Sequence, residues 1–299
     1  MPQISTRERA GAGIWLNGNA LDKRTRMQFA KMVGAVLKEA GNMSILPELV
    51  IPNPLPAAHG LDGKFVAWTD LVAAKKPEGS QTEIQRPELK EGVTYRLEQW
   101  EEVIGITDEA KINGQLGAQD LLNAGNAAKG FARAIDADGL AALYGLTPTA
   151  ASGDWSTATD QDIIDDIGGA VDSIETGGFD PTHIILDRNQ WLRISNMEWV
   201  INTSKTATDY LNQVFGLKVV MSRKISYVDS AGTRVDMFDP VDKVMIMDKA
   251  GYAVWSQRPT TIELERDVSR GVDLAYMRKF FKTVRVQDDA AVLLDGIVI

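Results

Sequence analysis

The sequence predicts an α+β protein with two lobes. Residues 244–299 read as a compact series of strands, in which apolar residues alternate with charged ones at a period of two. Residues 108–145 instead repeat apolar residues every three or four positions, which is the spacing of one long amphipathic helix. The 299 residues can bury a large core and form two lobes, since single domains commonly run ~100–200 residues.

Composition and charge exclude several classes of protein. The chain has no cysteine, so disulfides, thiolate catalysis and cysteine-based metal sites are excluded. No apolar run approaches the ~20 residues that a membrane helix needs, and no basic segment followed by an apolar one marks a signal peptide at Met1. The net charge of −9 argues against tight nucleic-acid binding, which needs a basic surface. We therefore expect an acidic protein without a membrane or secretion signal.

The N-terminal part of the chain divides into an arm, a helix and a connector. Residues 1–20 mix glycines with charged residues at no sustained period, which predicts a flexible arm or a simple disordered terminus. Asp22 can cap a helix that ends at Gly41. The proline-rich residues 51–56 favour extended backbone and are expected to form a connector.

A long hairpin is predicted between residues 61 and 100. Residues 64–72 and 93–97 are strand-like, and the tip between them, residues 74–90, is rich in Lys, Pro, Glu, Gly and Gln. A tip of this composition cannot bury enough apolar surface to fold by itself. It is therefore expected to be mobile, with its charges solvated, or to lie on another molecule.

The longest helix is expected within residues 108–145. A helix over residues 116–143 would span roughly 40 Å at ~1.5 Å per residue. Alanine and glycine on its apolar face allow close approach of a sheet or a second helix. Gly145 and Pro148 end it, and a loop follows.

The run of acidic residues 160–166 has two interpretations. Alternate carboxylates are the ligands of hard cations, so a calcium site is one of them. The other is an amphipathic helix that ends at Gly177, because isoleucine and valine recur at three- and four-residue spacing as far as Ile174. We favour the helix, since carboxylates in the first turn of a helix are stabilised by its dipole.

The second lobe begins with a strand and two short helices. Residues 181–186 predict a buried strand, and residues 187–194 predict a capped helix that turns Trp191 and Ile194 inward. A second helix ends at Gly216. Its apolar side is assigned to Tyr210, Leu211 and Val214. A strand over residues 217–221 and a hydrophilic hairpin around residues 229–232 follow.

The C-terminal strands are predicted as hairpins. Residues 244–247 and 252–255 are apolar runs joined by turn-forming residues, which predicts a first hairpin. A turn is expected at residues 258–259. Beyond it, residues 261–265 and 272–286 alternate at a period of two, so that one face is buried and the other exposed.

The sequence contains few candidate catalytic residues. His183 lies in an apolar strand, where a core histidine is the expected role, and His59 follows the proline-rich connector. Neither has a partner at metal-ligand spacing. The sequence contains neither a Gly-x-Ser-x-Gly elbow nor a phosphate-binding loop. We expect no catalytic residue, no metal and no cofactor.

Three consecutive segments carry a resemblance to a known family. The order GLKVVMSRKI, then KVMIMDKAGYAVWSQRPTTIELERD, then DLAYMRKFFKTVRVQDDAAVLLDGI resembles the C-terminal half of Hong Kong 97-type major capsid proteins of tailed bacteriophages and archaeal tailed viruses. The resemblance covers roughly residues 180–299. Encapsulins share that fold. The resemblance to these capsid proteins implies an N-terminal arm, an extended loop, a peripheral domain with a spine helix, and an axial domain.

The resemblance also implies boundaries, contacts and partners. The arm is residues 1–20, and the extended loop, residues 60–100, lies across the adjacent subunit. The peripheral domain takes residues 21–59, 101–175 and 248–285, and the axial domain takes residues 176–247 and 286–299. Contacts between subunits are expected at Trp68, Lys75, Lys76, Arg86 and Arg96 in the loop.

The function implied is that of a major capsid protein. Copies would assemble into hexamers and pentamers of an icosahedral shell around double-stranded DNA, with only weak contacts to the DNA and none to a membrane. Separate scaffolding, portal and decoration proteins are candidate partners, and the expected place is the virion capsid, assembled in the host cytoplasm. An encapsulin-like nanocompartment holding cargo enzymes and a metal-dependent enzyme using residues 160–166 are the alternatives.

Overall fold

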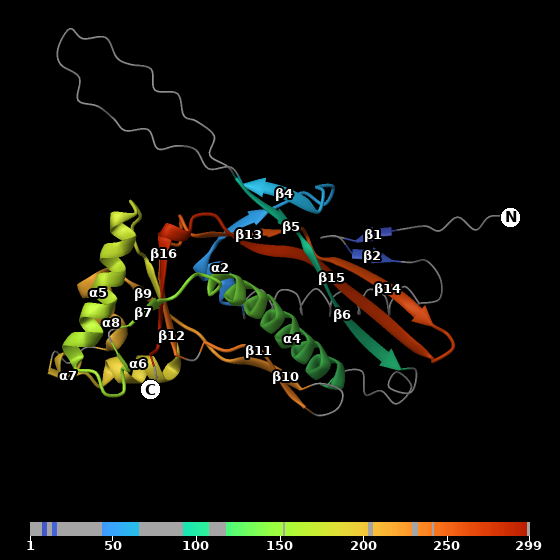
Figure 1. The fold of residues 1–299 in the computed structure, drawn as a ribbon. Helices are drawn as coiled ribbons and strands as arrows, with labels where there is room; N and C mark the ends of the chain where they lie inside the picture. Colours follow the sequence, from blue (N-terminus) through green and yellow to red (C-terminus); the bar gives the residue numbers. More distant parts are fainter. Residues whose placement is uncertain are drawn as a thin grey trace, which may run out of the picture.

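The computed structural model describes residues 8–10, 14–16, 44–65, 92–107, 118–151, 153–202, 206–228, 233–240 and 242–297. The molecule is elongated, with a long sheet at one end and a smaller sheet with a group of helices at the other (Figure 1). The α+β class predicted from the sequence is confirmed. None of the described helices combines the length and the apolar character needed to cross a membrane.

The large sheet has seven strands and is built around its longest one, β15. Along one side β15 pairs with β6, and along the other with β14 and then β13. All three pairings are antiparallel, whereas β3 and β2 add to β13 and β14 in parallel. The strands are β1 (Glu8–Ala10), β2 (Ile14–Leu16), β3 (Ile51–Pro54), β6 (Glu98–Thr107), β13 (Ala253–Gln257), β14 (Thr261–Asp267) and β15 (Val272–Arg285).

The turn predicted at residues 258–259 is wrong. Strands β13 and β14 run in the same direction along β15, with Gln257 opposite Phe281 and Thr261 opposite Arg278. Pro259 has no N–H to donate, so it interrupts the ladder without reversing the chain. The Arg258 N–H still donates to the Phe280 carbonyl at 2.9 Å, which keeps the two halves in line.

The small sheet has five strands in the order β7-β16-β12-β8-β9. It is mixed, because β12 is antiparallel to both of its neighbours while β9 is parallel to β8 and β7 to β16. The strands are β7 (Thr149–Ala150), β8 (His183–Leu186), β9 (Lys218–Met221), β12 (Lys243–Met247) and β16 (Ala291–Asp295), with a 3-10 turn, η1 (Asp288–Ala290), before β16.

The hairpin predicted from residues 244–247 and 252–255 is also wrong. The first run is β12, whose two edges are already paired with β16 and β8 in the small sheet. The second run begins β13 of the large sheet, so the turn between them passes from one sheet to the other. Both runs are apolar because each is buried, and burial does not specify a partner strand.

Alternation along the small sheet divides its side chains between two hydrophobic clusters. Ile184 and Ile246 point to a cluster shared with the helices of the small lobe. Ile185 and Met245 point to the opposite face, where they join the core beneath the large sheet. In Figure 1, β12 and β16 accordingly stand between α5 and α4.

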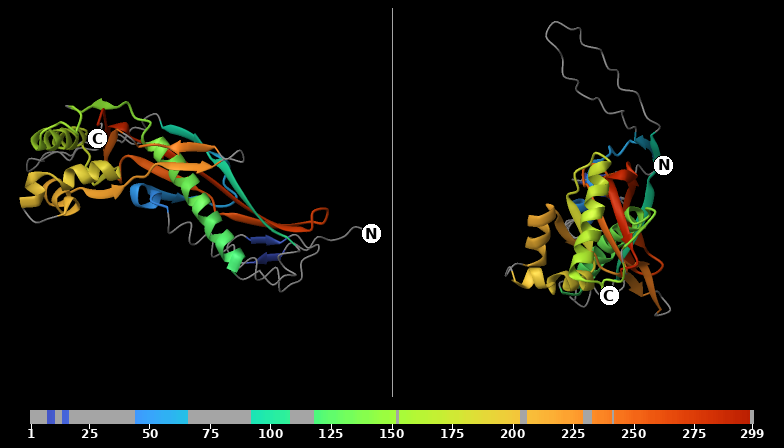
Figure 2. Two further views of the ribbon diagram at one scale, coloured as in Figure 1. Left: turned by 90° about the horizontal axis from the view of Figure 1, so that it is seen from below. Right: turned by 60° about the vertical axis from the view of Figure 1, so that its left-hand side comes forward.

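The helices cover one face of each sheet. They are α2 (Leu46–Leu49), α4 (Ala118–Leu143), α5 (Asp160–Thr176), α6 (Arg188–Ser195), α7 (Glu198–Asn202) and α8 (Ala207–Phe215). α4 lies against β15, β6 and β11, and the long helix predicted from the sequence is confirmed over its 26 residues. Figure 2 shows α5 and the group α6–α8 as neighbouring helices of the small lobe, and both pack on one hydrophobic cluster.

Two hairpins lie outside the two larger sheets. One joins β4 (Asp62–Phe65) to β5 (Val93–Arg96), and the other joins β10 (Ile225–Val228) to β11 (Arg234–Phe238). The connector predicted at residues 51–56 is extended, as expected, but its first four residues form β3 of the large sheet. The helix predicted to end at Gly41 and the tip around residues 229–232 lie outside the described residues.

Candidate assembly surfaces

The predicted extended loop leaves the body through the antiparallel strands β4 and β5. Phe65 stacks on Tyr95 with 4.9 Å between ring centroids, which holds the two strands together where the loop begins. Arg96 of β5 pairs with Asp62 of β4 at 3.9 Å, and the two side chains are 74% and 78% exposed. An ion pair so exposed contributes little stability, so the Arg96 guanidinium can contact another molecule at small cost.

The other predicted contact residues lie outside the part of the chain that the structure describes. These are Trp68, Lys75, Lys76 and Arg86. Arg96 is therefore placed at the base of the loop, and contact with a neighbouring subunit stays a prediction for all five residues.

A cavity of ≈550 Å³ lies between β5 and the C-terminal part of β15. Arg96, Lys282 and Arg285 line it together with the acidic Glu98 and Asp288. Because basic and acidic side chains both face the cavity, its lining does not select a ligand of one charge.

Ion pairs cross the strands of the large sheet. Arg278 of β15 contacts Glu101 of β6 and lies 2.7 Å from Glu263 of β14. Lys282 of β15 bonds Glu98 of β6 at 2.5 Å. Each basic side chain thus links β15 to its neighbours, and these basic groups are matched by carboxylates of the same sheet.

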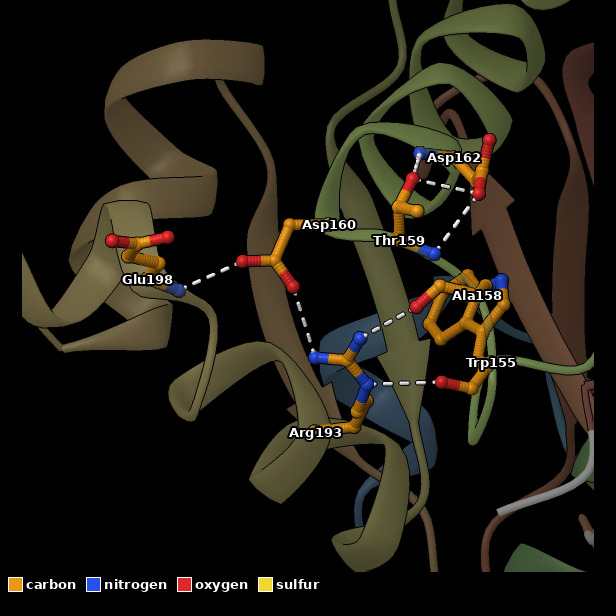
Figure 3. Close-up of polar contacts among 7 residues, drawn as sticks. All are labelled: Trp155, Ala158, Thr159, Asp160, Asp162, Arg193 and Glu198. Atoms are coloured by element: carbon orange, nitrogen blue, oxygen red, sulfur yellow. Dashed lines mark hydrogen bonds and ion pairs between the residues drawn. The ribbon is translucent and has the colours of Figure 1, made fainter.

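A polar network fixes the start of α5 against α6 and α7 (Figure 3). The Arg193 guanidinium donates to the carbonyls of Trp155 and Ala158, at 2.9 Å each, and to the Asp160 carboxylate at 3.1 Å. The other oxygen of Asp160 accepts from the backbone N–H of Glu198 at 2.8 Å. A charged fork with three acceptors gives a more rigid junction than apolar contact alone, so α5 and α6–α7 are held in one relative orientation.

The same geometry decides between the two interpretations of the acidic run. Asp162 and Thr159 form a capping box at the start of α5, and these hydrogen bonds lower the pKa of the Asp162 carboxyl. Asp166 accepts from the Trp155 indole at 2.9 Å, while Asp160 binds Arg193. Among the described residues, no group of three or more His, Asp or Glu side chains could hold a metal ion.

The two histidines lie in different surroundings. His183 is buried, and its Nδ1 lies 2.9 Å from the Thr182 hydroxyl. Burial lowers the pKa of His183, and the nearby charges of Lys249 and Lys218 lower it further, which agrees with the predicted core histidine. The Nδ1 of His59 lies 2.9 Å from the carbonyl of the next residue.

Sequence reasoning missed an exposed apolar surface on the small lobe, which we call the α6–β9 apolar surface. Its members, with their exposed fractions, are Leu192 (41%), Trp199 (49%), Ile201 (60%), Val214 (52%) and Met221 (36%). They come from α6, α7, α8 and β9, which form a chain of contacts, α7 to α6 to α8 to β9. They make up five of the nine large apolar side chains found exposed in the described part of the chain, so they are concentrated there.

The prediction for Val214 is wrong. It was assigned to the apolar side of α8, but its side chain is exposed. Tyr210 and Leu211 do face the core, but in the last turn of α8 it is Phe215, and not Val214, that packs against the core. The run Trp199-Val200-Ile201 was the available signal for the exposed surface. Three successive apolar residues on a helix point in different directions, so only Val200 is buried.

The comparison with known protein families decides the identity. A family model described as phage capsid protein matches residues 90–294, which is well over half of the chain. The chain belongs to the phage capsid protein family. No significant match was found among curated protein sequences.

Solved structures show the fold of this capsid protein independently. It is similar to a virus-like particle protein from Pyrococcus furiosus, with 10% identity, 89% of this chain and 98% of that chain covered, and a TM-score of 0.62. It is similar to a phage-related protein from Bordetella bronchiseptica RB50, with 14% identity, 88% and 96% covered, and a TM-score of 0.62. The capsid of Myoviridae phage XM1 matches at 11% identity, with 85% and 92% covered, and a TM-score of 0.59.

These matches confirm the resemblance found in the sequence. The capsid protein has the Hong Kong 97-type fold, and it is a structural subunit of a capsid shell built from many copies of itself. Its place is the virion capsid. Neither the nanocompartment nor the metal-dependent enzyme gains support from the matches.

Proposed function

We propose that the chain is the major capsid protein of a tailed virus, assembling as hexamers and pentamers of an icosahedral shell around double-stranded DNA. The observation that carries this proposal is the phage capsid family match over residues 90–294, on a chain that folds as capsid subunits do. Assembly takes place in the host cytoplasm, and the chain has no enzymatic role.

The subunit divides as the resemblance implies. The two hydrophobic clusters, one on each side of the small sheet, support a division into a peripheral and an axial domain. We assign the arm to residues 1–20, the extended loop to 60–100, the peripheral domain to 21–59, 101–175 and 248–285, and the axial domain to 176–247 and 286–299.

Assembly draws on several modest contacts at once. A standard protein interface buries ~1,600 Å² in total, and ordering a loop on a neighbour offsets part of the gain. When arm, loop and axial domain all engage, each contact raises the effective concentration of the others. A closed shell then resists dissociation while single contacts remain reversible.

The charge of the subunit suits a container for DNA. With a net charge of −9, acidic groups outnumber the basic groups that could displace counterions from phosphates. The subunit therefore makes only weak contacts with the packaged DNA. Separate scaffolding, portal and decoration proteins are its candidate partners.

Deletion of residues 74–90 tests whether the extended loop is needed to close the shell. Residues 66–73, 91 and 92 remain to connect Phe65 to Val93, so the β4–β5 pair can still form. We expect a folded monomer or capsomer, because every described strand and helix is kept. We also expect no closed shells in negative-stain electron microscopy, whereas the unaltered chain forms them.

Circular dichroism and sedimentation of the deleted chain provide the control for folding. Intact particles from a folded, deleted chain would contradict a role of the loop in closing the shell. The contents of purified particles test the enclosed DNA, since packaged DNA and a co-purified cargo protein distinguish a virus shell from a nanocompartment.

A further inference from the structure

The net charge of the small lobe differs between its two groups of helices. α5, residues 160–176, contains six Asp and Glu residues and no Lys or Arg. Residues 188–221, which include α6–α8 and β9, contain four Lys and Arg residues and two acidic ones. On α5 itself, Asp165, Asp172 and Glu175 are exposed. One side of the lobe is thus strongly acidic, and the other is slightly basic.

The α6–β9 apolar surface lies on the slightly basic side. Ile201 is 60% exposed and Leu192 is 41% exposed, although removing large apolar side chains from water lowers the free energy. Clustered exposed apolar residues on a lobe whose core is otherwise well filled mark a contact surface.

Figure 2 shows α5 and α6–α8 as two neighbouring groups of helices in the small lobe, and the Arg193 network fixes the two relative to each other. Closed rings form when one surface of a subunit binds a different surface of the next, with a fixed rotation between them. Two unlike and rigidly connected surfaces meet that requirement.

We propose that the α6–β9 apolar surface of one subunit docks on the acidic α5 side of the next subunit in the ring. This proposal rests on the proposed function, because it names the two surfaces by which a capsomer closes. Apolar burial supplies the attraction, and the opposite net charges of the two sides set the direction and exclude docking of two α5 sides on each other.

Variants of Ile201 with opposite charges test the proposal. Ile201 is exposed, so Ile201→Lys and Ile201→Glu should both fold, and circular dichroism with thermal unfolding checks this. Because the facing surface is acidic, we expect Ile201→Glu to weaken ring formation at least about tenfold more than Ile201→Lys. Sedimentation velocity over a range of concentrations measures the assembled fraction.

A charge exchange sharpens the test. Adding Asp172→Lys on α5 to Ile201→Glu should restore most of the assembly, since the new basic group then faces the new acidic one. The matched control is Val268→Glu, an equally drastic change at a side chain 76% exposed on the β14–β15 turn, which should assemble as the unaltered chain does.

Cysteine crosslinking reads the contact directly, because the chain has no cysteine of its own. With Ile201→Cys and Asp172→Cys in one chain, a flexible bis-maleimide should give a ladder of covalent oligomers up to the closed ring. Ile201→Cys alone should give almost none.

The outcomes separate this proposal from the proposed function. Equal loss with Lys and Glu, or strong crosslinking of Ile201→Cys alone, would mean that the apolar surface binds its own copy, and the proposal falls. Particles that assemble normally from Ile201→Glu would overturn the proposal and leave the proposed function standing. If the unaltered chain and Val268→Glu form neither rings nor shells at any concentration, both fall.

Discussion

Asp136 joins two helices that are distant in the sequence. Helix α2 has no capping side chain of its own, since its N-cap residue is Ile45. The Asp136 carboxylate of α4 takes that place, accepting from the Ser44 hydroxyl at 2.6 Å and from the backbone N–H groups of Ile45 and Leu46 at 3.0 and 3.3 Å. The carboxylate is buried, which raises its pKa in spite of these hydrogen bonds.

Replacing Asp136 by Ala should lower the free energy of unfolding by about 1–3 kcal/mol, because buried N–H groups lose their acceptor. Asp136→Asn should cost less, since its amide oxygen can still accept. Urea denaturation measures both. Asp172→Ala, an exposed carboxylate on α5, is the control and should stay within about 0.5 kcal/mol of the unaltered chain.

Glu102 of β6 is a second carboxylate held against α4. A Cβ added to Gly130 of α4 would lie 3.4 Å from Glu102 Oε1, so the helix passes close to the carboxylate. Burial raises the pKa of Glu102 to about 7 from 4.5. Between these two values the folded chain keeps a proton that the unfolded chain has released, so stability falls as the pH rises through this range.

Glu102→Gln should therefore make the chain more stable at pH 8 and leave stability at pH 4 unchanged. The gain at pH 8 is on the order of 1 kcal/mol once solvent screening of a half-buried group is allowed for. Denaturation of the unassembled chain at both pH values provides the measurement, with the exposed Glu175→Gln as control. An equal change at both pH values would contradict the assigned cause.

At the scale of elements, close approach explains where glycine is required in the helices. A Cβ at Gly139 of α4 would meet the Leu46 methyl carbons at 2.4 and 2.7 Å, and Leu46 is fully buried. Nothing lies within 4 Å of a Cβ at Gly169 of α5. The same residue type thus serves packing in one helix and has no steric role in the other.

Alanine substitutions at these two glycines should have opposite effects. Gly139→Ala should destabilise by about 1–3 kcal/mol, since overpacking against Leu46 outweighs the gain in helix propensity. Gly169→Ala should stabilise by about 0.5–1 kcal/mol, because only the propensity changes. Thermal or urea unfolding of each variant measures the difference. Equal signs would show that the α2–α4 contact is looser than described.

At the scale of the whole molecule, the small sheet connects the two lobes. Its faces are buried on both sides, with Ile184 in one cluster and Ile185 in the other. The Tyr252 hydroxyl also donates to the Leu143 carbonyl, which ties the start of the large sheet's β13 to the end of α4. The subunit therefore presents its outer surfaces from one connected body, and a shell can be built by adding contacts around it.

The sequence by itself determined what depends on local pattern. Period-two alternation predicted β14 and β15, helical spacing predicted α4 and α5, and the order of the C-terminal segments predicted the capsid fold. Only the tertiary structure decided which strands pair, since the apolar runs before and after residues 248–251 belong to different sheets. It alone revealed the exposed side chains of α7 and the capping of α2 by Asp136. Pairing, exposure and long-range capping depend on groups far apart in the sequence, which local periodicity does not encode.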